Sequence, residues 1–371
     1  MDKTPLINVG HVLLGCRFDV WLRLLWQNRF KIRPRSIPQA LFQTLVSLLF
    51  FPFALLERLI FAWPIRRQKV EQPIFILGHW RSGTTYLQNL LSRDPALGWF
   101  DPLGATAFNN CLLLGWLLRP VMGGLLPTAR PMDNMKYGFD LPMEEVFAIA
   151  DTSPLAVDTL LSFPGNYQYY LDAAFVDELP PARRREWQRV YRYILKKQCW
   201  RCGGRQMLMK TPDATMRAAE LYRLYPDAKF IHIHRHPYQV VRSTINMFTK
   251  LIHKMCLQQE PAPEFIEQMI VATSGRIFAK VMADLEKLPP SQVIEVSYED
   301  FEREPLEWTR RIYEHLGIDG WQEAAPRFQQ YIDSQRGYQK NSFDLPPSLR
   351  AAIDKACAPY FARYGYQMKE S

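Results

Sequence analysis

Short apolar runs alternate with amphipathic segments along much of the chain, and each apolar run has the length of a buried strand. The first is Pro-Ile-Phe-Ile-Leu-Gly at 73–78, and three more lie at 206–210, 229–235 and 293–301. Segments with helical periodicity follow these runs, as at 84–92. Strands that alternate with helices predict a central parallel sheet covered by helices on both faces. The pattern therefore predicts a single α/β domain.

The first 70 residues contain no such strand and are predicted to be mainly helical. Four prolines are expected to break this region: Pro34, Pro38, Pro52 and Pro64. We find no internal repeat and no low-complexity linker. The pattern divides the chain into an N-terminal helical region, residues 1–70, and an α/β domain, residues 71–371.

An apolar stretch at 41–63 is long enough to span a bilayer. It contains Pro52, Glu57 and Arg58, which argue against a span. Basic residues flank it on both sides: Arg33, Arg35, Arg66, Arg67 and Lys69. Such flanks are typical of a helix lying in the membrane interface. Besides a span, two interpretations stay open, a helix in the interface and a cover over the substrate pocket.

The net charge of the chain predicts an anionic partner. The chain has 46 Lys and Arg against 37 Asp and Glu, a net charge of +9. This balance favours a nucleotide phosphate, an acidic membrane surface or nucleic acid. No basic run with interleaved aromatic residues indicates nucleic acid, so we expect none as a partner. The aromatic content of 13% suits either an apolar ligand pocket or a plain core.

The cysteines and the N-terminus favour the cytoplasm. Cys199 and Cys202 form a CxxC pair, but no second pair with zinc-finger spacing follows. Free thiols in a reducing cytosol are therefore expected, rather than a metal or redox site. The N-terminus has no basic segment followed by a compact apolar run and a cleavage site, so no secretory signal is predicted.

A glycine-bounded loop follows the first predicted strand. From Gly78 to Thr85 it reads GHWRSGTT, with the GxxxxG spacing of a phosphate-binding loop. In such loops, backbone N–H groups and a helix N-terminus converge on an anion. A P-loop NTPase has Lys after the second glycine, whereas this chain has Thr84, and the loop's cation is Arg81. The loop therefore suits a phosphate-like group other than a transferred γ-phosphate.

A second anion-binding pair is predicted at Arg235 and Ser243. The strand at 229–235 brings Arg235 to the carboxyl edge of the sheet, where α/β proteins bind ligands. Ser243 lies eight residues later, two turns into the next helix. An arginine fork and a nearby hydroxyl can hold a phosphate monoester. We expect two separate anion pockets, at Arg81 and Arg235.

Two segments carry a resemblance to a known family. PIFILGHWRSGTTYL resembles the 5′-phosphosulfate loop of sulfotransferases that use 3′-phosphoadenosine 5′-phosphosulfate (PAPS), and HRHPYQVVRST resembles their 3′-phosphate segment. The chain is most similar to the bacterial branch. The resemblance implies a P-loop-like sulfotransferase fold, PAPS as co-substrate and no metal. It also implies the residues that bind PAPS: Arg81, Ser82, Gly83, Thr84, Thr85, Arg235 and Ser243.

Weaker matches add three residues. LMKTPD at 208–213 resembles a segment whose lysine faces the active cleft, which implies a catalytic role for Lys210. The stretch around Gly337 lies where a late basic loop closes over the nucleotide, which suggests Arg336 and Lys340 as further PAPS-binding residues. VSYEDF at 296–301 resembles a strand-to-helix junction and is assigned a structural role.

The acceptor hydroxyl needs a general base within reach. The histidine that serves this purpose in animal cytosolic sulfotransferases has no counterpart here. Instead, an acidic segment opens a helix predicted to begin near Pro142, and it resembles the acidic segment of the bacterial branch. Glu144 is the first candidate and Glu145 the second, although both could be helix N-terminal acids favoured by the macrodipole. His79 and Asp101 are reserve candidates.

These observations predict a sulfotransferase that moves a sulfuryl group from PAPS to a hydroxyl of a small apolar acceptor. A sterol, a quinone, another lipid alcohol or a phenol fits the apolar segments better than a sugar. Two alternatives remain: a P-loop kinase or NTPase, and a non-catalytic membrane-peripheral protein that binds anions. The protein is expected in the cytoplasm or on the inner face of the membrane, and its oligomeric state stays open.

Overall fold

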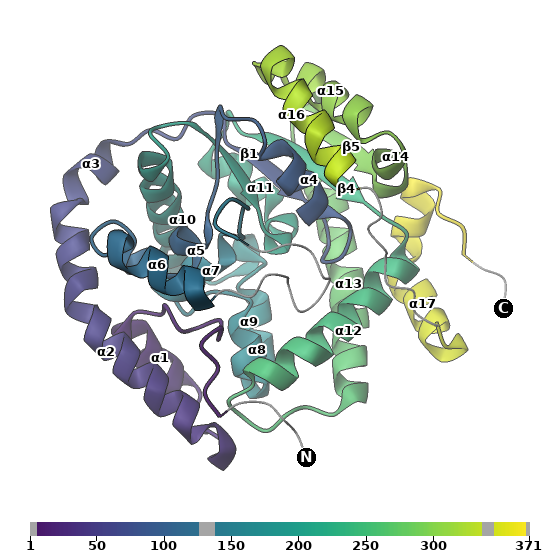
Figure 1. Cartoon of the computed structure of the whole chain (residues 1–371). Coiled ribbons are helices and arrows are strands. Elements are labelled where there is room, and N and C mark those ends of the chain that lie inside the picture. The colour runs from purple at the N-terminus through teal and green to yellow at the C-terminus, as the bar shows by residue number, and fades with distance from the viewer. Residues whose placement is uncertain (1–5, 126–137, 336–344, 369–371) are drawn as a thin grey trace. The chain divides into compact units, whose positions relative to one another are not determined.

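The computed structural model describes residues 6–125, 138–335 and 345–368 (Figure 1). The chain forms two compact units, each assembled from segments far apart in the sequence. Unit 1 comprises residues 1–70, 99–204 and 248–262. Unit 2 comprises residues 71–98, 205–247 and 263–371.

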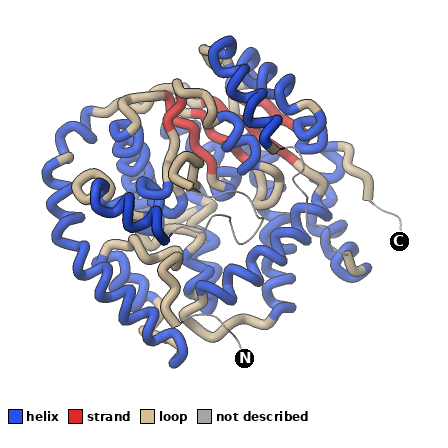
Figure 2. Tube along the Cα trace, viewed as in Figure 1, coloured by secondary structure: helices blue, strands red, loops and turns tan. Residues whose placement is uncertain are grey.

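Unit 2 contains a five-stranded parallel sheet (Figure 2). Its strands are β1 (Ile74–Leu77), β2 (Leu97–Gly98), β3 (Gln206–Lys210), β4 (Lys229–His234) and β5 (Val293–Ser297). The order across the sheet is β2-β3-β1-β4-β5, so β1 lies at the centre. The predicted α/β class and its central parallel sheet are confirmed. The two-residue strand β2 was not predicted, because so short a pairing leaves no apolar pattern.

The central strand is buried on both faces, as its uninterrupted apolar sequence requires. Because side chains alternate along a strand, Ile74 and Ile76 join a core cluster on one face, whereas Phe75 points to the other. There Phe75 stacks on Phe230 of β4 with ring centroids 5.6 Å apart. Register pairs Phe75 with Phe230, which brings the carboxyl ends of β1 and β4 side by side.

Helices cover both faces of this sheet. The unit 2 helices are α4 (Thr84–Leu91), α11 (Ala218–Leu224), α13 (Pro263–Leu285), α14 (Tyr298–Arg303), α15 (Pro305–Leu316), α16 (Trp321–Ser334) and α17 (Pro347–Tyr364). Helix α12 (Pro237–Met255) begins in unit 2, and its last residues belong to unit 1. Leu87, Leu90 and Leu91 of α4 pack into the core cluster, which fixes the loop between β1 and α4 at its helical end.

Unit 1 is built from helices joined by loops in its described residues. Its helices are α1 (Phe18–Gln27), α2 (Ile37–Ile60), α3 (Ala62–Arg67), α5 (Pro102–Thr106), α6 (Gly115–Leu125), α7 (Val146–Thr152), α8 (Thr159–Ser162), α9 (Tyr167–Asp172) and α10 (Pro181–Arg201). In the part of the chain that the structure describes, 3-10 turns occur at Pro34–Ser36, Phe108–Asn110, Pro164–Asn166, Val176–Glu178, Pro212–Met216 and Pro290–Gln292.

Four expected helix boundaries were wrong. Pro38 lies in the first turn of α2, where its missing N–H has no helical partner to lose. Pro52 lies inside α2, which continues for eight residues beyond it, and Pro64 lies inside α3. The helix expected near Pro142 begins instead at Val146, directly after Glu145.

A buried ion pair holds the interior of unit 1 together. Glu57 of α2 and Lys197 of α10 are each 1% exposed and bind one another. The second carboxylate oxygen of Glu57 accepts the backbone N–H groups of Leu112 and Leu113 at 2.9 and 2.7 Å, and Lys197 also donates to the Phe108 carbonyl. Buried charges are tolerated only when paired and hydrogen-bonded in this way.

Candidate active site

The loop between β1 and α4 runs from Gly78 to Gly83 and is closely packed at its first glycine. The Gly78 N–H donates to the Thr215 hydroxyl at 2.7 Å. A Cβ at position 78 would lie 2.6 Å from the Ser82 hydroxyl oxygen and 2.8 Å from the Ile233 carbonyl oxygen. Glycine is therefore needed here, because these atoms leave no room for a Cβ.

The second glycine, Gly83, is needed because a side chain there would clash with Tyr298. Gly83 has φ of +99°, and a Cβ there would lie 2.2 Å from the ring of Tyr298, the first residue of α14. Within the same loop Arg81 has φ of +70°, an uncommon conformation for a residue with a side chain. Strain of this kind persists only where neighbouring contacts hold it, and it is common at ligand-binding loops.

Contacts from two other segments hold Arg81. Its Nε donates to the Ser243 hydroxyl of α12 at 3.0 Å. Arg235, which follows β4, donates from its guanidinium to the Arg81 carbonyl oxygen at 3.1 Å. The Arg235 guanidinium also lies 4.2 Å from the centre of the Tyr298 ring, a cation–π contact. Arg81, Arg235, Ser243 and Tyr298 thus form one connected group, which we call the arginine cluster.

The arginine cluster differs from the arrangement expected from the sequence. Two separate pockets were predicted, whereas hydrogen bonds join Arg81, Arg235 and Ser243 directly. Parallel pairing of β1 with β4 explains this, because the segments that leave their carboxyl ends start next to one another. The 3′ and 5′ groups of one nucleotide share a ribose, so side chains this close can contact both.

Tyr298 was missed as a candidate site residue. Its segment was predicted to have a structural role, which the place of Tyr298 in the core cluster fits. The same ring, however, contacts the Arg235 guanidinium and fixes the space at Gly83. An aromatic residue directly after a strand of the parallel sheet was the signal that could have found it.

Lys210 lies at the carboxyl end of β3, the strand on the other side of β1. Its ammonium donates to the Thr85 hydroxyl at 3.3 Å in the first turn of α4, and the residue is 1% exposed. Thr84 begins α4, and the Ser82 hydroxyl donates to the His79 carbonyl at 2.8 Å. The structure therefore brings the loop residues, Lys210, Arg235 and Ser243 together at one edge of the sheet.

His79 is packed beneath the loop. Its ring nitrogens lie 3.0 Å from the Trp80 carbonyl oxygen and 3.0 Å from the Ser274 hydroxyl. Burial lowers the pKa of His79 to about 4, an effect that the bond to the Trp80 carbonyl only partly offsets. With both nitrogens engaged and 3% of the residue exposed, His79 packs the loop.

The carboxylate candidates for the base lie in unit 1. Glu145 precedes α7, is 1% exposed, and accepts a hydrogen bond from the Tyr191 hydroxyl at 3.3 Å. Glu144 is partly exposed. Asp101 caps α5 through the Gly104 N–H at 2.8 Å and forms a two-pronged ion pair with Arg201 at 2.5 and 2.8 Å.

Two further predicted features are the late basic residues Arg336 and Lys340 and the CxxC pair. Arg336 and Lys340 lie outside the described residues. The thiols of Cys199 and Cys202 face different carbonyl groups, those of Lys69 and Trp99, at 3.5 and 3.6 Å, and neither is in a disulfide.

Comparison with known proteins identifies the family. The family model described as the sulfotransferase family matches residues 73–323, which include the loop, Lys210 and the whole arginine cluster. The chain belongs to the sulfotransferase family. The predicted family is therefore confirmed, and the kinase or NTPase alternative is excluded.

Two kinds of relative support this assignment. The omega-hydroxy-beta-dihydromenaquinone-9 sulfotransferase Stf3 of Mycobacterium bovis is 30% identical over 358 residues, covering 95% of this chain and 90% of that protein, and the protein of the same name from Mycobacterium tuberculosis matches equally. Sulfotransferase STF1 of M. tuberculosis has a TM-score of 0.61 at 18% identity and covers 94% of this chain and 95% of that one. STF9 of Mycobacterium avium has a TM-score of 0.61 at 16% identity, with coverage of 96% and 98%. The two solved structures confirm the fold of this sulfotransferase.

Proposed function

We propose that this sulfotransferase moves a sulfuryl group from PAPS to the hydroxyl of a lipid alcohol. The observation that carries the proposal is the arginine cluster at the end of a phosphate-binding loop. PAPS is the usual donor of the family, and it carries a 5′-phosphosulfate and a 3′-phosphate on one ribose. The cluster offers two guanidinium groups and a hydroxyl beside that loop.

Each side chain has a distinct role in this proposal. The loop amides, Thr84 and Thr85 bind the 5′-phosphosulfate, while Arg235 and Ser243 bind the 3′-phosphate. Arg81 stabilises the negative charge that builds up on the departing phosphate oxygen as the sulfuryl group leaves. Because arginine stays protonated, it acts by charge and hydrogen bonding and does not release a proton.

Lys210 lies beside the first turn of α4, next to the loop. Its contact with the Thr85 hydroxyl places its charge at the N-terminus of α4, where anions bind. In the proposal Lys210 neutralises the sulfuryl oxygens and helps to orient the donor. A lysine on a buried strand end is a suitable group for this purpose, since three N–H bonds diverge from one point charge.

Glu144 is proposed to accept the proton of the acceptor hydroxyl. Of the two neighbouring glutamates, Glu145 is in the interior of unit 1 with the Tyr191 hydroxyl, whereas Glu144 remains accessible. Glu145 in this proposal positions the start of α7. The difference in exposure favours Glu144 as the residue that meets a substrate.

The acceptor is proposed to be a lipid alcohol, such as the hydroxylated side chain of a prenylated quinone. The Stf3 relatives are named for an omega-hydroxy menaquinone derivative. The apolar helices of unit 1 favour an acceptor of this chemistry, because a prenyl chain needs apolar surface to leave water. A sterol or a phenol belongs to the same apolar class and is included in the test below.

A transfer assay with ³⁵S-labelled PAPS tests this proposal. The wild-type enzyme is incubated with a hydroxylated prenyl quinone, a sterol, a simple phenol and a polar glycan. We expect product with an apolar alcohol, a fall of at least about 100-fold in kcat for Arg81→Ala, and a similar fall for Glu144→Gln, with a smaller effect for Glu145→Gln. Sulfation of the glycan alone would contradict the acceptor class. Full activity of Glu144→Gln would remove it as the base.

A further inference from the structure

Helix α2 turns its polar side chains inward and its apolar side chains outward. Its buried residues are mostly polar: Gln39, Gln43, Ser47, Ala54 and Glu57. Leucines occupy the opposite, exposed side, which we call the apolar face of α2: Leu41, Leu45, Leu48, Leu49, Leu56 and Leu59. Leu45 is 66% exposed and Leu59 76%. A surface helix of a globular protein normally shows the reverse arrangement.

The inward polar groups fasten α2 to unit 1 along its length. The Gln43 amide donates to the Leu13 carbonyl at 2.5 Å, and the Trp21 indole of α1 donates to the Thr44 hydroxyl at 2.9 Å. At the far end Glu57 belongs to the buried ion pair with α10.

These contacts between α2 and the rest of unit 1 indicate whether the helix would cross a membrane or lie in its plane. The segment Pro34–Ile60 is long and apolar enough to cross a bilayer, but only 22% of its most apolar window is buried. If α2 crossed a bilayer, the ion pair and amide groups behind it would enter hydrocarbon, which is costly. A helix lying in the membrane plane keeps those groups inside unit 1 and places the apolar face against the lipid. Side chains that face outward also do not line a pocket beneath the helix.

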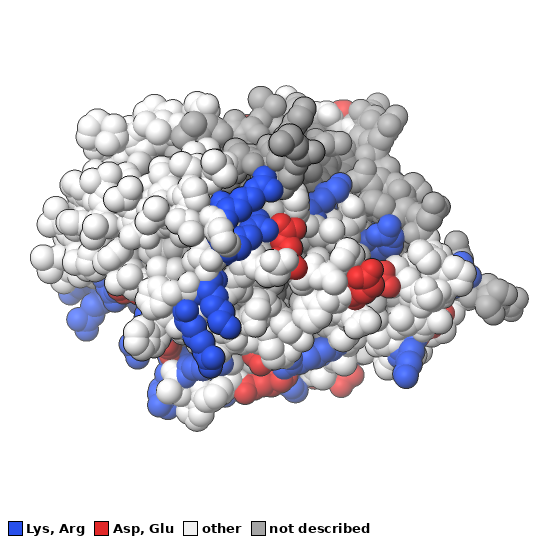
Figure 3. Space-filling view, turned by 90° about the horizontal axis from the view of Figure 1, so that it is seen from below, with Lys and Arg blue, Asp and Glu red and all other residues white. Residues whose placement is uncertain are grey.

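Large aromatic residues of other unit 1 segments are exposed as well. They are Trp26 in α1, Phe30 just after it, Trp63 in α3 and Trp116 in α6, which is 77% exposed. Tryptophan is enriched at membrane interfaces, where its ring is apolar and its N–H stays hydrated. Figure 3 shows an area with few charged residues at left, the side on which Figure 1 shows α2, with Lys and Arg along its edge.

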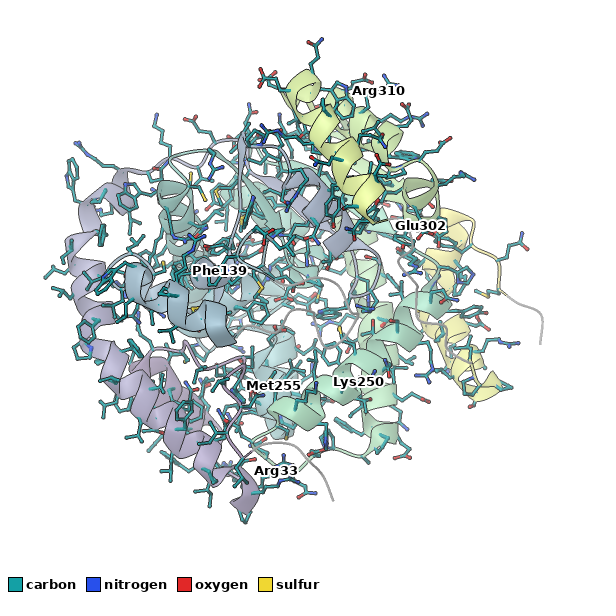
Figure 4. The ribbon with its side chains drawn as sticks, in the orientation of Figure 1. Arg33, Phe139, Lys250, Met255, Glu302 and Arg310 are labelled. Carbon is teal, nitrogen blue, oxygen red and sulfur yellow. The ribbon has the colours of Figure 1, made fainter. Side chains whose placement is uncertain are left out.

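Charge at the ends of α2 is complementary to an anionic surface. Exposed basic residues near the two ends of the helix include Arg29, Lys31, Arg35, Arg66, Arg67 and Lys69. Asp19 and Glu57 are the acids between residues 6 and 70, and each pairs with a basic side chain. Arg33, labelled in Figure 4, pairs with Glu260 at 2.5 Å and adds no net charge. A second copy of this surface would bring the same positive charges together, so the charges favour anionic lipid over self-association.

We propose that unit 1 binds an anionic lipid bilayer through the apolar face of α2, with the helix in the plane of the membrane. The tryptophans lie at the depth of the headgroups, and the basic residues contact anionic lipid phosphates. This surface goes beyond the proposed function and does not rest on it, because bilayer binding needs neither donor nor acceptor. A membrane-bound enzyme would meet a lipid alcohol where that alcohol is dissolved.

Vesicle flotation with the 371-residue chain tests the proposal. Wild type is mixed with phosphatidylcholine vesicles, alone or with about 30% phosphatidylglycerol, at low and high salt. The variant Leu41→Gln/Leu45→Gln/Leu49→Gln removes apolar surface from α2. The matched control, Phe265→Gln/Met368→Gln, changes exposed apolar residues of unit 2. A third variant, Arg66→Gln/Arg67→Gln, removes charge and leaves the apolar face unchanged.

We expect wild type and the control to float with the anionic vesicles, less so at high salt. The leucine variant should lose about tenfold or more in partitioning, and the arginine variant should lose its preference for anionic lipid. Failure of wild type to float, or unchanged flotation of the leucine variant, overturns the proposal. A lipid-independent dimer in sedimentation velocity that the leucine variant abolishes would assign the face to a second copy instead. Should the leucine variant not fold by circular dichroism, the arginine variant decides: unchanged preference for anionic lipid overturns the proposal.

Discussion

Replacing Gly83 by alanine should damage both stability and donor binding, because the position combines two constraints. The backbone has φ of +99°, which disfavours any residue with a Cβ, and the added Cβ would lie 2.2 Å from the Tyr298 ring. The first constraint costs about 1–2 kcal/mol. Overpacking at the second adds about 1–3 kcal/mol, since Tyr298 is 9% exposed and belongs to the core cluster.

Gly320 supplies a control that separates the two constraints. Like Gly83, it caps the N-terminus of a helix in the left-handed conformation, with φ of +85°. Nothing lies within 4 Å of a Cβ built there. Gly320→Ala should therefore cost only the backbone term, about 1–2 kcal/mol, and leave donor binding unchanged.

The assay is thermal unfolding of both variants together with titration of 3′-phosphoadenosine 5′-phosphate, the product nucleotide. Each kcal/mol corresponds to a fall of about 2–4 °C in Tm. Gly83→Ala should fall further than Gly320→Ala and bind the nucleotide at least about tenfold more weakly, because displacement of Tyr298 withdraws the ring under Arg235. If the two variants unfold alike and bind the nucleotide as wild type does, the close contact with Tyr298 does not shape the site.

Two more predictions concern paired charges. Glu57→Gln should destabilise the protein by about 3–5 kcal/mol in urea unfolding, because it leaves the Lys197 ammonium buried without its partner. The double variant Glu57→Gln/Lys197→Met should be less destabilised than the sum of the two single changes. Additive effects would argue against the ion pair. For Glu295, burial acts to raise the pKa, but hydrogen bonds from His232 and Tyr364 hold it at about 2 against an ordinary 4.5. The stability that this carboxylate contributes is present above pH 4.5 and is lost as the pH falls toward 2. Glu295→Gln should therefore make the free energy of unfolding depend less steeply on pH in this range. An unchanged slope would contradict the assignment.

The sheet was predictable because a buried strand appears in the sequence as a short, mostly apolar run. The run at 74–77 is apolar on both faces, and the run at 229–234 is buried through its first five residues although it reads KFIHIH, as a covered parallel strand requires. The course of α2 was not predictable in the same way. Pro52 argued for a break, whereas the contacts of the helix with the rest of unit 1 hold it continuous through the proline.

The candidate site was predicted by residue type but not by geometry. The GHWRSGTT loop and Arg235 each carry a chemical pattern that can be recognised along the chain. The bond between Arg81 and Ser243 joins residues 162 positions apart, and it depends on the pairing of β1 with β4. Glu57 illustrates the same limit, since its charge argued against a membrane span, while its partner Lys197 was visible only in the folded chain.

Arg235 and Ser243 of the arginine cluster are proposed to bind the 3′-phosphate of the donor, and calorimetric titration with paired nucleotides tests this assignment most directly. Wild type and Arg235→Ala are each titrated with 3′-phosphoadenosine 5′-phosphate and with adenosine 5′-phosphate, which lacks the 3′-phosphate. Wild type should prefer the doubly phosphorylated nucleotide by about 100-fold, worth about 2.7 kcal/mol, and Arg235→Ala should lose most of that preference. Equal weakening of both nucleotides, or no preference in wild type, would contradict the account.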